Sequence, residues 1–148
     1  MNMISNFPWL LVAVIIYNVI AFSLGVSPEP DAAGRIVTAF DNPLVSFTMI
    51  SGAVWQLTLG DVMIMLTLAF LFVELIKATR TSSYSIVDHA LSMVVFIICI
   101  VEFLAVPQAA TSVFFIIIIV VLIDVIAGFT ITIRAAKRDV AFGGAEGH

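Results

Sequence analysis

The chain has 148 residues, of which 62% are hydrophobic and only 11% are charged, with a mean hydropathy of +1.21. Soluble domains are about 45–50% apolar and about 25% charged, so a water-soluble fold of this size could not hide so much apolar surface. These values exclude an ordinary soluble domain and predict a protein that has lipid as its solvent. The length suits one compact bundle, so residues 1–148 are expected to form a single domain.

The formal net charge of −4 conceals a segregation of the charged residues. Five of the six basic residues lie in two short segments beside apolar runs, here called the basic segments: Lys77 with Arg80, and Arg134 with Lys137 and Arg138. No basic stripe is interleaved with aromatic residues, so no nucleic-acid partner is expected. The single cysteine, Cys99, excludes an intrachain disulfide and a CxxC redox pair.

Four apolar stretches approach or exceed the roughly 20 residues that cross a hydrocarbon core about 30 Å thick. They predict helices over residues 7–24, 59–76, 86–106 and 112–133. The first stretch lacks the basic residues that open a signal peptide, so we expect a retained helix. The last is rich in β-branched residues, but a lone strand could not satisfy its backbone in lipid. The predicted fold class is therefore an all-α membrane protein with four transmembrane helices.

The basic segments also indicate the orientation, because cytoplasmic ends of membrane helices are enriched in Lys and Arg. One segment joins the second and third stretches, and the other follows the fourth. The outer loop, residues 25–58, has one basic residue against three acidic ones, and residues 107–111 carry no charge. Both termini are therefore expected in the cytoplasm. The glycine-rich end of the chain, residues 140–148, is expected to be a flexible tail.

The second half of the outer loop holds two β-rich runs on either side of Ser51 and Gly52. A two-residue loop with glycine between such runs predicts an extracytoplasmic β-hairpin. The alternatives are an irregular loop and an early start of the second helix. An isolated two-stranded hairpin is only marginally stable, so this one would rest on the membrane surface or on another chain.

A two-residue loop would also set the register of this hairpin. It would bring Thr48 opposite Trp55 on one face. On the other face it would bring Phe47 opposite Gln56, so both faces would be partly apolar. The residues expected to form an assembly surface are Phe47, Met49, Val54 and Trp55.

Several polar side chains interrupt the apolar stretches, although a charge at the bilayer centre costs about 3 kcal/mol on insertion scales. Depths follow from the rise of about 1.5 Å per helical residue. The expected levels are the cytoplasmic edge for Glu74, Asp88 and His89, the midplane for Asp124 and Asn18, and the outer edge for Asp61 and Glu102.

Each expected helix also has one seam of polar or small residues, the composition found where membrane helices touch. In the second helix heptad spacing places Gly60, Thr67 and Glu74 on one face. In the third helix one stripe contains Asp88, Ser92, Cys99 and Glu102. In the fourth helix Asp124 and Gly128 are neighbours one turn apart. These seams are expected to face the interior of the bundle.

The intramembrane polar network has two interpretations. In the first, its carboxylates form a path for protons or cations, with Glu74 and Asp88 at the inner mouth, Asp124 in the middle, and Asp61 and Glu102 outside. In the second, which we favour, they join helices or cap their ends. Asp61 suits a helix N-terminus, and Glu74 can pair with Lys77 three residues later. Only Asp124 and Glu102 lack such a local explanation, and a structural Asp124 would need a hydrogen bond, for which Asn18 is the expected partner.

Cofactors and catalysis are not expected. The two histidines are His89 and His148, so ligation of a haem by two histidines would require two copies of the chain, since His148 lies in the tail. No metal-ligand spacing, nucleophile motif or phosphate-binding loop is present in the sequence.

The runs SGAVWQLTLGD (51–61), VDHALS (87–92) and LIDVIAGF (122–129) resemble a family of uncharacterised bacterial inner-membrane proteins with four helices. The resemblance covers roughly residues 43–139. It implies a location in the bacterial inner (plasma) membrane and implies no activity.

The leading hypothesis is a non-enzymatic accessory or self-assembling subunit of a membrane complex. Its partners would be membrane lipid and either further copies or other membrane subunits. The alternative is a proton- or cation-conducting protein centred on Asp124, with Glu102, Asp88 and Glu74 as relay groups. An enzyme that acts on lipid is a distant third hypothesis.

Overall fold

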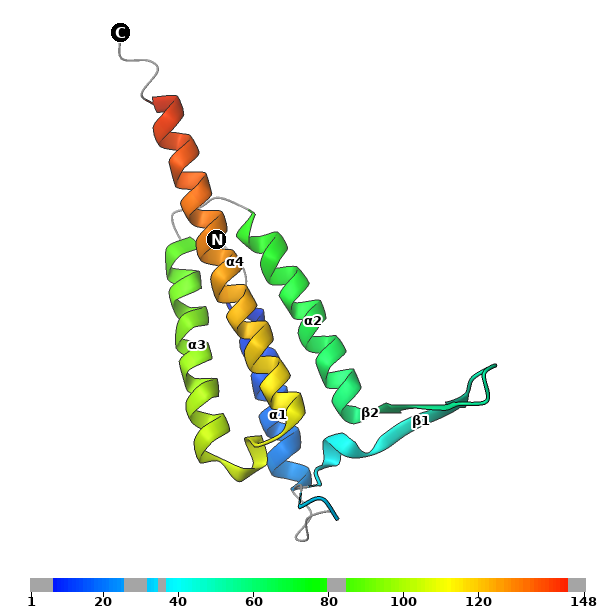
Figure 1. The fold of residues 1–148 in the computed structure, drawn as a ribbon. Helices are drawn as coiled ribbons and strands as arrows, with labels where there is room; N and C mark the ends of the chain where they lie inside the picture. Colours follow the sequence, from blue (N-terminus) through cyan, green and yellow to red (C-terminus); the bar gives the residue numbers. More distant parts are fainter. Residues whose placement is uncertain (1–6, 26–31, 35–36, 80–84, 144–148) are drawn as a thin grey trace.

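The computed structural model describes residues 7–25, 32–34, 37–79 and 85–143. The chain forms four helices and one small antiparallel sheet (Figure 1). In chain order the elements are α1 (Trp9–Leu24), the short 3-10 helix η2 (Ala39–Asp41), β1 (Pro43–Thr48), β2 (Val54–Thr58), α2 (Leu59–Ala78), α3 (Ser85–Ala105), the 3-10 helix η3 (Pro107–Ala109) and α4 (Ser112–Gly143).

The four helices expected from the apolar stretches are present, and local sequence explains where two of them begin or end. Gly25 ends α1 with φ = 71°, a conformation that only glycine adopts readily, and its N–H bonds to the carbonyl of Ala21. A capping box starts α2. The hydroxyl of Thr58 accepts from the N–H of Asp61, and the Asp61 carboxylate accepts from the N–H of Thr58.

The last helix is longer than the sequence indicated. We expected α4 to end near residue 133 and a flexible tail from residue 140, but the helix continues to Gly143. The physical reason lies in residues 134–138, which are Arg, Ala, Ala, Lys and Arg, all good helix formers. Residues 144–148 of the expected tail lie outside the described residues.

The helices alternate in direction and pack side by side (Figure 1). Helix α4 lies between α2 and α3 and packs on both, α1 packs mainly on α2, and the last turns of α4 project beyond the other helices (Figure 1). The core includes Leu10, Tyr17, Phe114, Ile117 and Val121. Each of these side chains is at most 2% exposed.

Tyr17 organises the end of the core next to the hairpin. Its ring stacks on Phe40 with centroids 4.5 Å apart and lies 4.6 Å from the ring of Phe114. Its hydroxyl donates to the carbonyl of Gln108 over 3.0 Å and lies 2.6 Å from the hydroxyl of Thr111. This one side chain therefore connects α1 to η2, η3 and the start of α4.

Two segments are long and apolar enough to cross a membrane, α2 and residues Ser112–Ile131 of α4. The apolar segments of the other two helices, Trp9–Leu24 in α1 and His89–Ala105 within α3, are shorter. Large hydrophobic side chains are exposed on the outward faces of all four helices. These features give weak support to a membrane protein, and the four-span topology stays a prediction.

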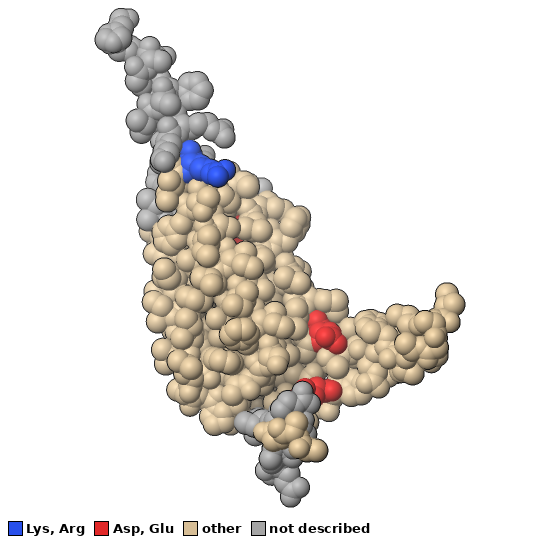
Figure 2. All heavy atoms as spheres, in the orientation of Figure 1, with Lys and Arg blue, Asp and Glu red and all other residues tan. Residues whose placement is uncertain are grey.

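The charged side chains are separated along the bundle (Figure 2). In the face shown, Lys and Arg lie at the end of the bundle where α2 ends. Acidic side chains lie at the opposite end beside the hairpin, and the surface between is almost entirely free of charge (Figure 2).

The predicted hairpin is confirmed, so both alternatives for this segment, an irregular loop and an early start of the helix, are wrong. Strands β1 and β2 pair antiparallel and project sideways from the end of the bundle where α2 begins (Figure 1). The pairing is irregular between Pro43 and Val45, so Leu44 is an extra residue in β1.

The predicted register of the hairpin is wrong by one residue. Phe47 lies opposite Trp55, not Gln56, and Thr48 lies opposite Val54, not Trp55. The loop contains three residues, and Gly52 alone among them has a positive φ, of 82°. A two-residue loop would need a positive φ at Ser51, which a residue with a side chain avoids, so the loop lengthens and only glycine takes that conformation.

The shift by one residue changes the chemistry of the hairpin, because side chains alternate between the two faces of a strand. One face carries only apolar side chains, here called the apolar face: Val45, Phe47, Met49, Ala53, Trp55 and Leu57. The other face carries Ser46, Thr48, Val54 and Gln56. The expectation of two partly apolar faces is therefore wrong, and the hairpin is amphipathic.

Candidate functional site

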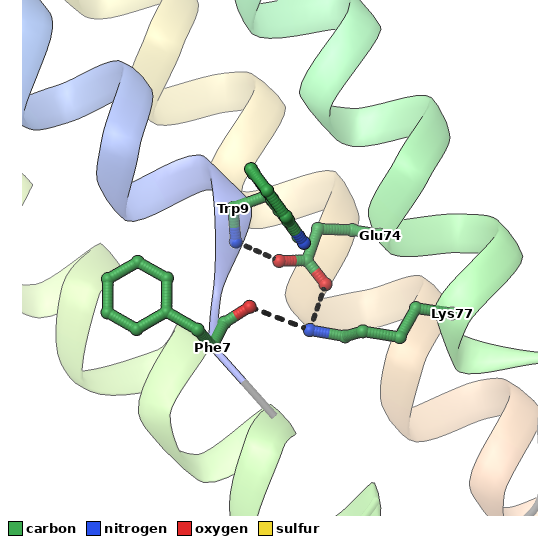
Figure 3. A network of polar contacts seen from close by, with 4 residues as sticks. All are labelled: Phe7, Trp9, Glu74 and Lys77. Atoms are coloured by element: carbon green, nitrogen blue, oxygen red, sulfur yellow. Dashed lines mark hydrogen bonds and ion pairs between the residues drawn. The ribbon is translucent and has the colours of Figure 1, made fainter. Parts of the chain in front are cut away.

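A buried carboxylate joins the end of α2 to the start of α1 (Figure 3). Glu74 is only 4% exposed, and its Oε2 lies 2.7 Å from Nζ of Lys77. Its Oε1 accepts a hydrogen bond from the backbone N–H of Trp9. Nζ of Lys77 also donates to the carbonyl of Phe7 over 3.0 Å. The ion pair that the sequence predicted therefore exists. Glu74 also binds the first residue of α1, and Lys77 binds a residue just before that helix.

The contact with Trp9 supplies what α1 lacks. The first N–H groups of a helix have no partner inside the helix and usually bond to a Ser, Thr, Asp or Asn at the N-cap. In α1 the N-cap is Pro8, which offers no side-chain cap, and no acidic residue lies in the first turn. Glu74 therefore caps this helix from α2, and its charge suits the positive end of the helix dipole.

A second buried carboxylate lies close to the first. Asp124, in the middle of α4, is 3% exposed, and its charge interacts with that of Glu74. The sequence placed Glu74 near the cytoplasmic edge and Asp124 near the midplane by counting from Lys77 and Arg134. Helix α4 continues beyond Arg134 to Gly143, so Arg134 does not mark the end of the helix. The interaction between the two acids places them in the same part of the bundle.

His89 of α3 lies on the same side of α4. The imidazole is 4% exposed and packs on Gly128, where a Cβ atom would stand 2.3 Å from Nδ1. The ring of Phe129 lies beside it, with centroids 5.9 Å apart. Gly128 follows Asp124 by one helical turn, so the absence of a side chain there lets α3 bring its histidine against the acidic face of α4.

These contacts define what we call the basic-end cluster: Glu74, Lys77, His89 and Asp124, with the backbone of Phe7 and Trp9. All four helices or their immediate ends contribute to it. Three of its four side chains are at most 4% exposed, and Lys77 is 16% exposed. Chemically, such a group can hold helices together or exchange protons.

A separate polar contact joins α1 to α3. The side chain of Asn18 forms a hydrogen bond with Glu102, and its Nδ2 also donates to the carbonyl of Val14 over 3.1 Å. The expected partner of Asn18 was Asp124. Depth estimates from single helices could not reveal this choice because they do not fix which helices are neighbours.

The polar seams face inward where the structure describes them. Gly60, Thr67 and Glu74 of α2 are all buried, as are Ser92 and Cys99 of α3. The side chain of Asp88 lies outside the described part of the chain. The hydroxyl of Thr67 donates to the carbonyl of Met63, so this buried group is satisfied within its own helix.

No group of three or more His, Cys, Asp and Glu side chains in the described ranges could hold a metal ion.

No protein-family model, curated protein or solved structure matches the chain. The resemblance to a bacterial inner-membrane family therefore stays a prediction.

Replacing Lys77 by methionine tests whether the ion pair supports the bundle. The change leaves the buried carboxylate of Glu74 without its cation, so we expect a clear loss of thermal stability in detergent. Removal of one partner from a fully buried pair costs about 3–5 kcal/mol, and the partial exposure of Lys77 should put the loss below that range.

The matched control is the double variant Glu74→Gln/Lys77→Met, which removes both charges and keeps the approximate volume. It should melt at a higher temperature than Lys77→Met alone. Equal melting of Lys77→Met and the wild type would show that the pair does not stabilise the packing of α1 on α2.

Proposed function

We propose that this chain is a non-enzymatic integral membrane protein that serves as an accessory or self-assembling subunit of a membrane complex. All four helices would cross the bacterial inner membrane, with both termini in the cytoplasm. Support comes from the packing of the two shorter apolar helices alongside the two long ones (Figure 1). At about 1.5 Å per residue, α1 is about 24 Å long and α2 about 30 Å, a mismatch that a bilayer accommodates at modest cost.

The observation that carries the non-enzymatic part is the use of buried polar groups as contacts between helices. Glu74 caps α1, and Glu102 bonds to Asn18. In lipid the hydrophobic effect does not drive helices together. Hydrogen bonds and close contacts between small residues drive their association instead. The tight approach of His89 to Gly128 is a contact of the second kind.

The assembly part is supported by the hairpin. Both of its strands have a free edge within the described sheet, because that sheet has only two strands. A free edge offers backbone N–H and C=O groups to another strand. The side chains along it carry no charge that would repel a neighbour, since residues 42–60 are uncharged. A neighbouring subunit could therefore extend the sheet.

Native mass measurement and cross-linking in native membranes test this proposal. We expect a complex larger than one chain, and we expect Thr48→Lys to reduce its fraction severalfold, because a lysine on an edge strand opposes the addition of another strand. Thr79→Lys makes the same change at an exposed position on the opposite end of α2 and should leave the fraction unchanged. A wild-type chain that is strictly monomeric and copurifies with nothing would contradict the proposal.

A second candidate function rests on one observation, the burial of Glu74, His89 and Asp124 in the basic-end cluster. Ionisable groups inside a membrane often mark the paths of protons or ions. In this alternative the chain would conduct protons or cations, with Asp124 as the central group.

Flux measurements in liposomes test that alternative. A conducting chain would give a pH-dependent flux that Asp124→Asn abolishes. The control is Asp41→Asn, since Asp41 lies outside the proposed path and asparagine can still accept the hydrogen bond from Thr38 at the start of η2. Absence of flux from the wild type, or equal flux from Asp124→Asn, would rule conduction out.

A further inference from the structure

The apolar face of the hairpin is exposed, although it groups the largest side chains of the segment. Phe47 is 53% exposed and Trp55 is 46% exposed. Their rings stack across the two strands with centroids 6.0 Å apart and an interplanar angle of 16°. The pair therefore forms a preorganised aromatic surface that nothing else in the described chain covers.

We propose that this apolar face lies on the membrane lipid, at the boundary between headgroups and acyl chains, at the end of the bundle where α2 begins. The inference rests on the membrane-spanning part of the proposed function. The hairpin would be a lipid anchor that fixes the outer end of the bundle in the interface. Its two strand edges would then lie in the membrane plane, where neighbouring subunits can reach them.

The direction of the hairpin is the first argument. It leaves the bundle sideways, across the direction of the helices, at the level where α2 starts (Figure 1). A segment with this direction runs along the surface of a membrane that the helices cross. A hairpin that continued along the helix direction would instead stand in water, away from lipid.

The chemistry of the hairpin is the second argument. From Asn42 to Gly60 the chain has no charged residue, and Asp41 and Asp61 immediately flank this stretch. An uncharged, one-sided apolar surface with charges only at its base matches the change from hydrocarbon to water at a membrane interface. Tryptophan is enriched in that layer because its ring is apolar and its N–H needs a polar partner.

Continuity with the bundle is the third argument. Leu57 is the member of the apolar face closest to the helices, and it is half-buried, as is Thr58 next to it, so the hairpin packs on the bundle at its base. Strand β2 then passes directly into α2, whose outward side chains include Met65 and Leu68, both about half exposed. Lipid at the interface could therefore cover the apolar face and the exposed side chains of α2 together. A protein partner would need a surface that fits the change of direction between β2 and α2.

Fluorescence quenching by lipid tests the inference, because the chain has two tryptophans and Trp55 can be isolated by Trp9→Phe. The full chain with this change is reconstituted into phosphatidylcholine vesicles whose acyl chains carry bromine either near the headgroup or near the chain end. We expect a blue-shifted emission and quenching by shallow bromines at least twofold stronger than by deep ones.

Two further variants in the same background show whether the apolar face is responsible. Phe47→Ser removes the stacked neighbour of Trp55 and should shift the emission toward longer wavelength and reduce the quenching. Gln56→Ala changes the opposite face and should leave both signals unchanged.

The outcomes separate the inference from the proposed function. A chain that carbonate washing strips from the vesicles would refute the membrane-spanning proposal, and the inference with it. An inserted chain whose Trp55 emits as in water, without quenching by brominated lipid, would overturn the inference alone. A blue-shifted Trp55 that lipid does not quench would mean that a second copy or another protein covers the face, and would overturn it too.

Discussion

The bundle depends on how it satisfies one carboxylate that is buried between apolar helices. Glu74 is almost fully enclosed, so it needs partners for both oxygens, and it finds them in Lys77 and in the N–H of Trp9. The same contacts resolve a second difficulty, since α1 begins at a proline and has no cap of its own. The packing of α1 on α2 therefore depends on the same contact that satisfies one oxygen of the buried carboxylate. Moving either helix by a single turn would leave the start of α1 uncapped and would remove one of the two partners of Glu74.

The other helices are joined in the same manner, by short polar or small residues within apolar surfaces. Gly128 admits the imidazole of His89 to the surface of α4, and Asn18 bonds to Glu102 between α1 and α3. At the opposite end the ring of Tyr17 takes a similar part, packed between aromatic rings with its hydroxyl bonded to the η3 turn. Each contact is specific in direction, whereas apolar packing alone would allow helices to rotate or slide. A small number of polar residues placed between helices is typical of a bundle that lipid surrounds.

Sequence predicted the elements well because their signals are local: long apolar runs for the helices, and glycine between β-rich runs for the hairpin. The end of α4 was missed because its last turns are charged, and charge signals the edge of a membrane without ending a helix. The hairpin register was missed by one residue because it depends on the conformation of Ser51, and that one residue decides which side chains share a face. The pairing of Glu74 with Lys77 was predicted because both lie on one helix. The contacts of Glu74 with Trp9 and of Asn18 with Glu102 could not be predicted, because they join different helices and a single sequence does not specify which helices are neighbours. Because Pro8 at the start of α1 offers no side-chain cap, the sequence could have indicated that an acceptor from another part of the chain would cap this helix.

If the bundle crosses a membrane as proposed, the hairpin lies on one side of the bilayer and the basic segments lie on the other. Cysteine labelling measures this directly, because Cys99 is buried and can be replaced by alanine to give a cysteine-free background. Single cysteines are then placed at Ile50 on the hairpin tip and at Thr79 beyond the end of α2, both exposed positions. With a membrane-impermeant maleimide on intact bacteria, we expect labelling of Ile50→Cys, and labelling of Thr79→Cys only after the membrane is permeabilised. Labelling of both cysteines from outside, or of Thr79→Cys alone, would contradict this arrangement.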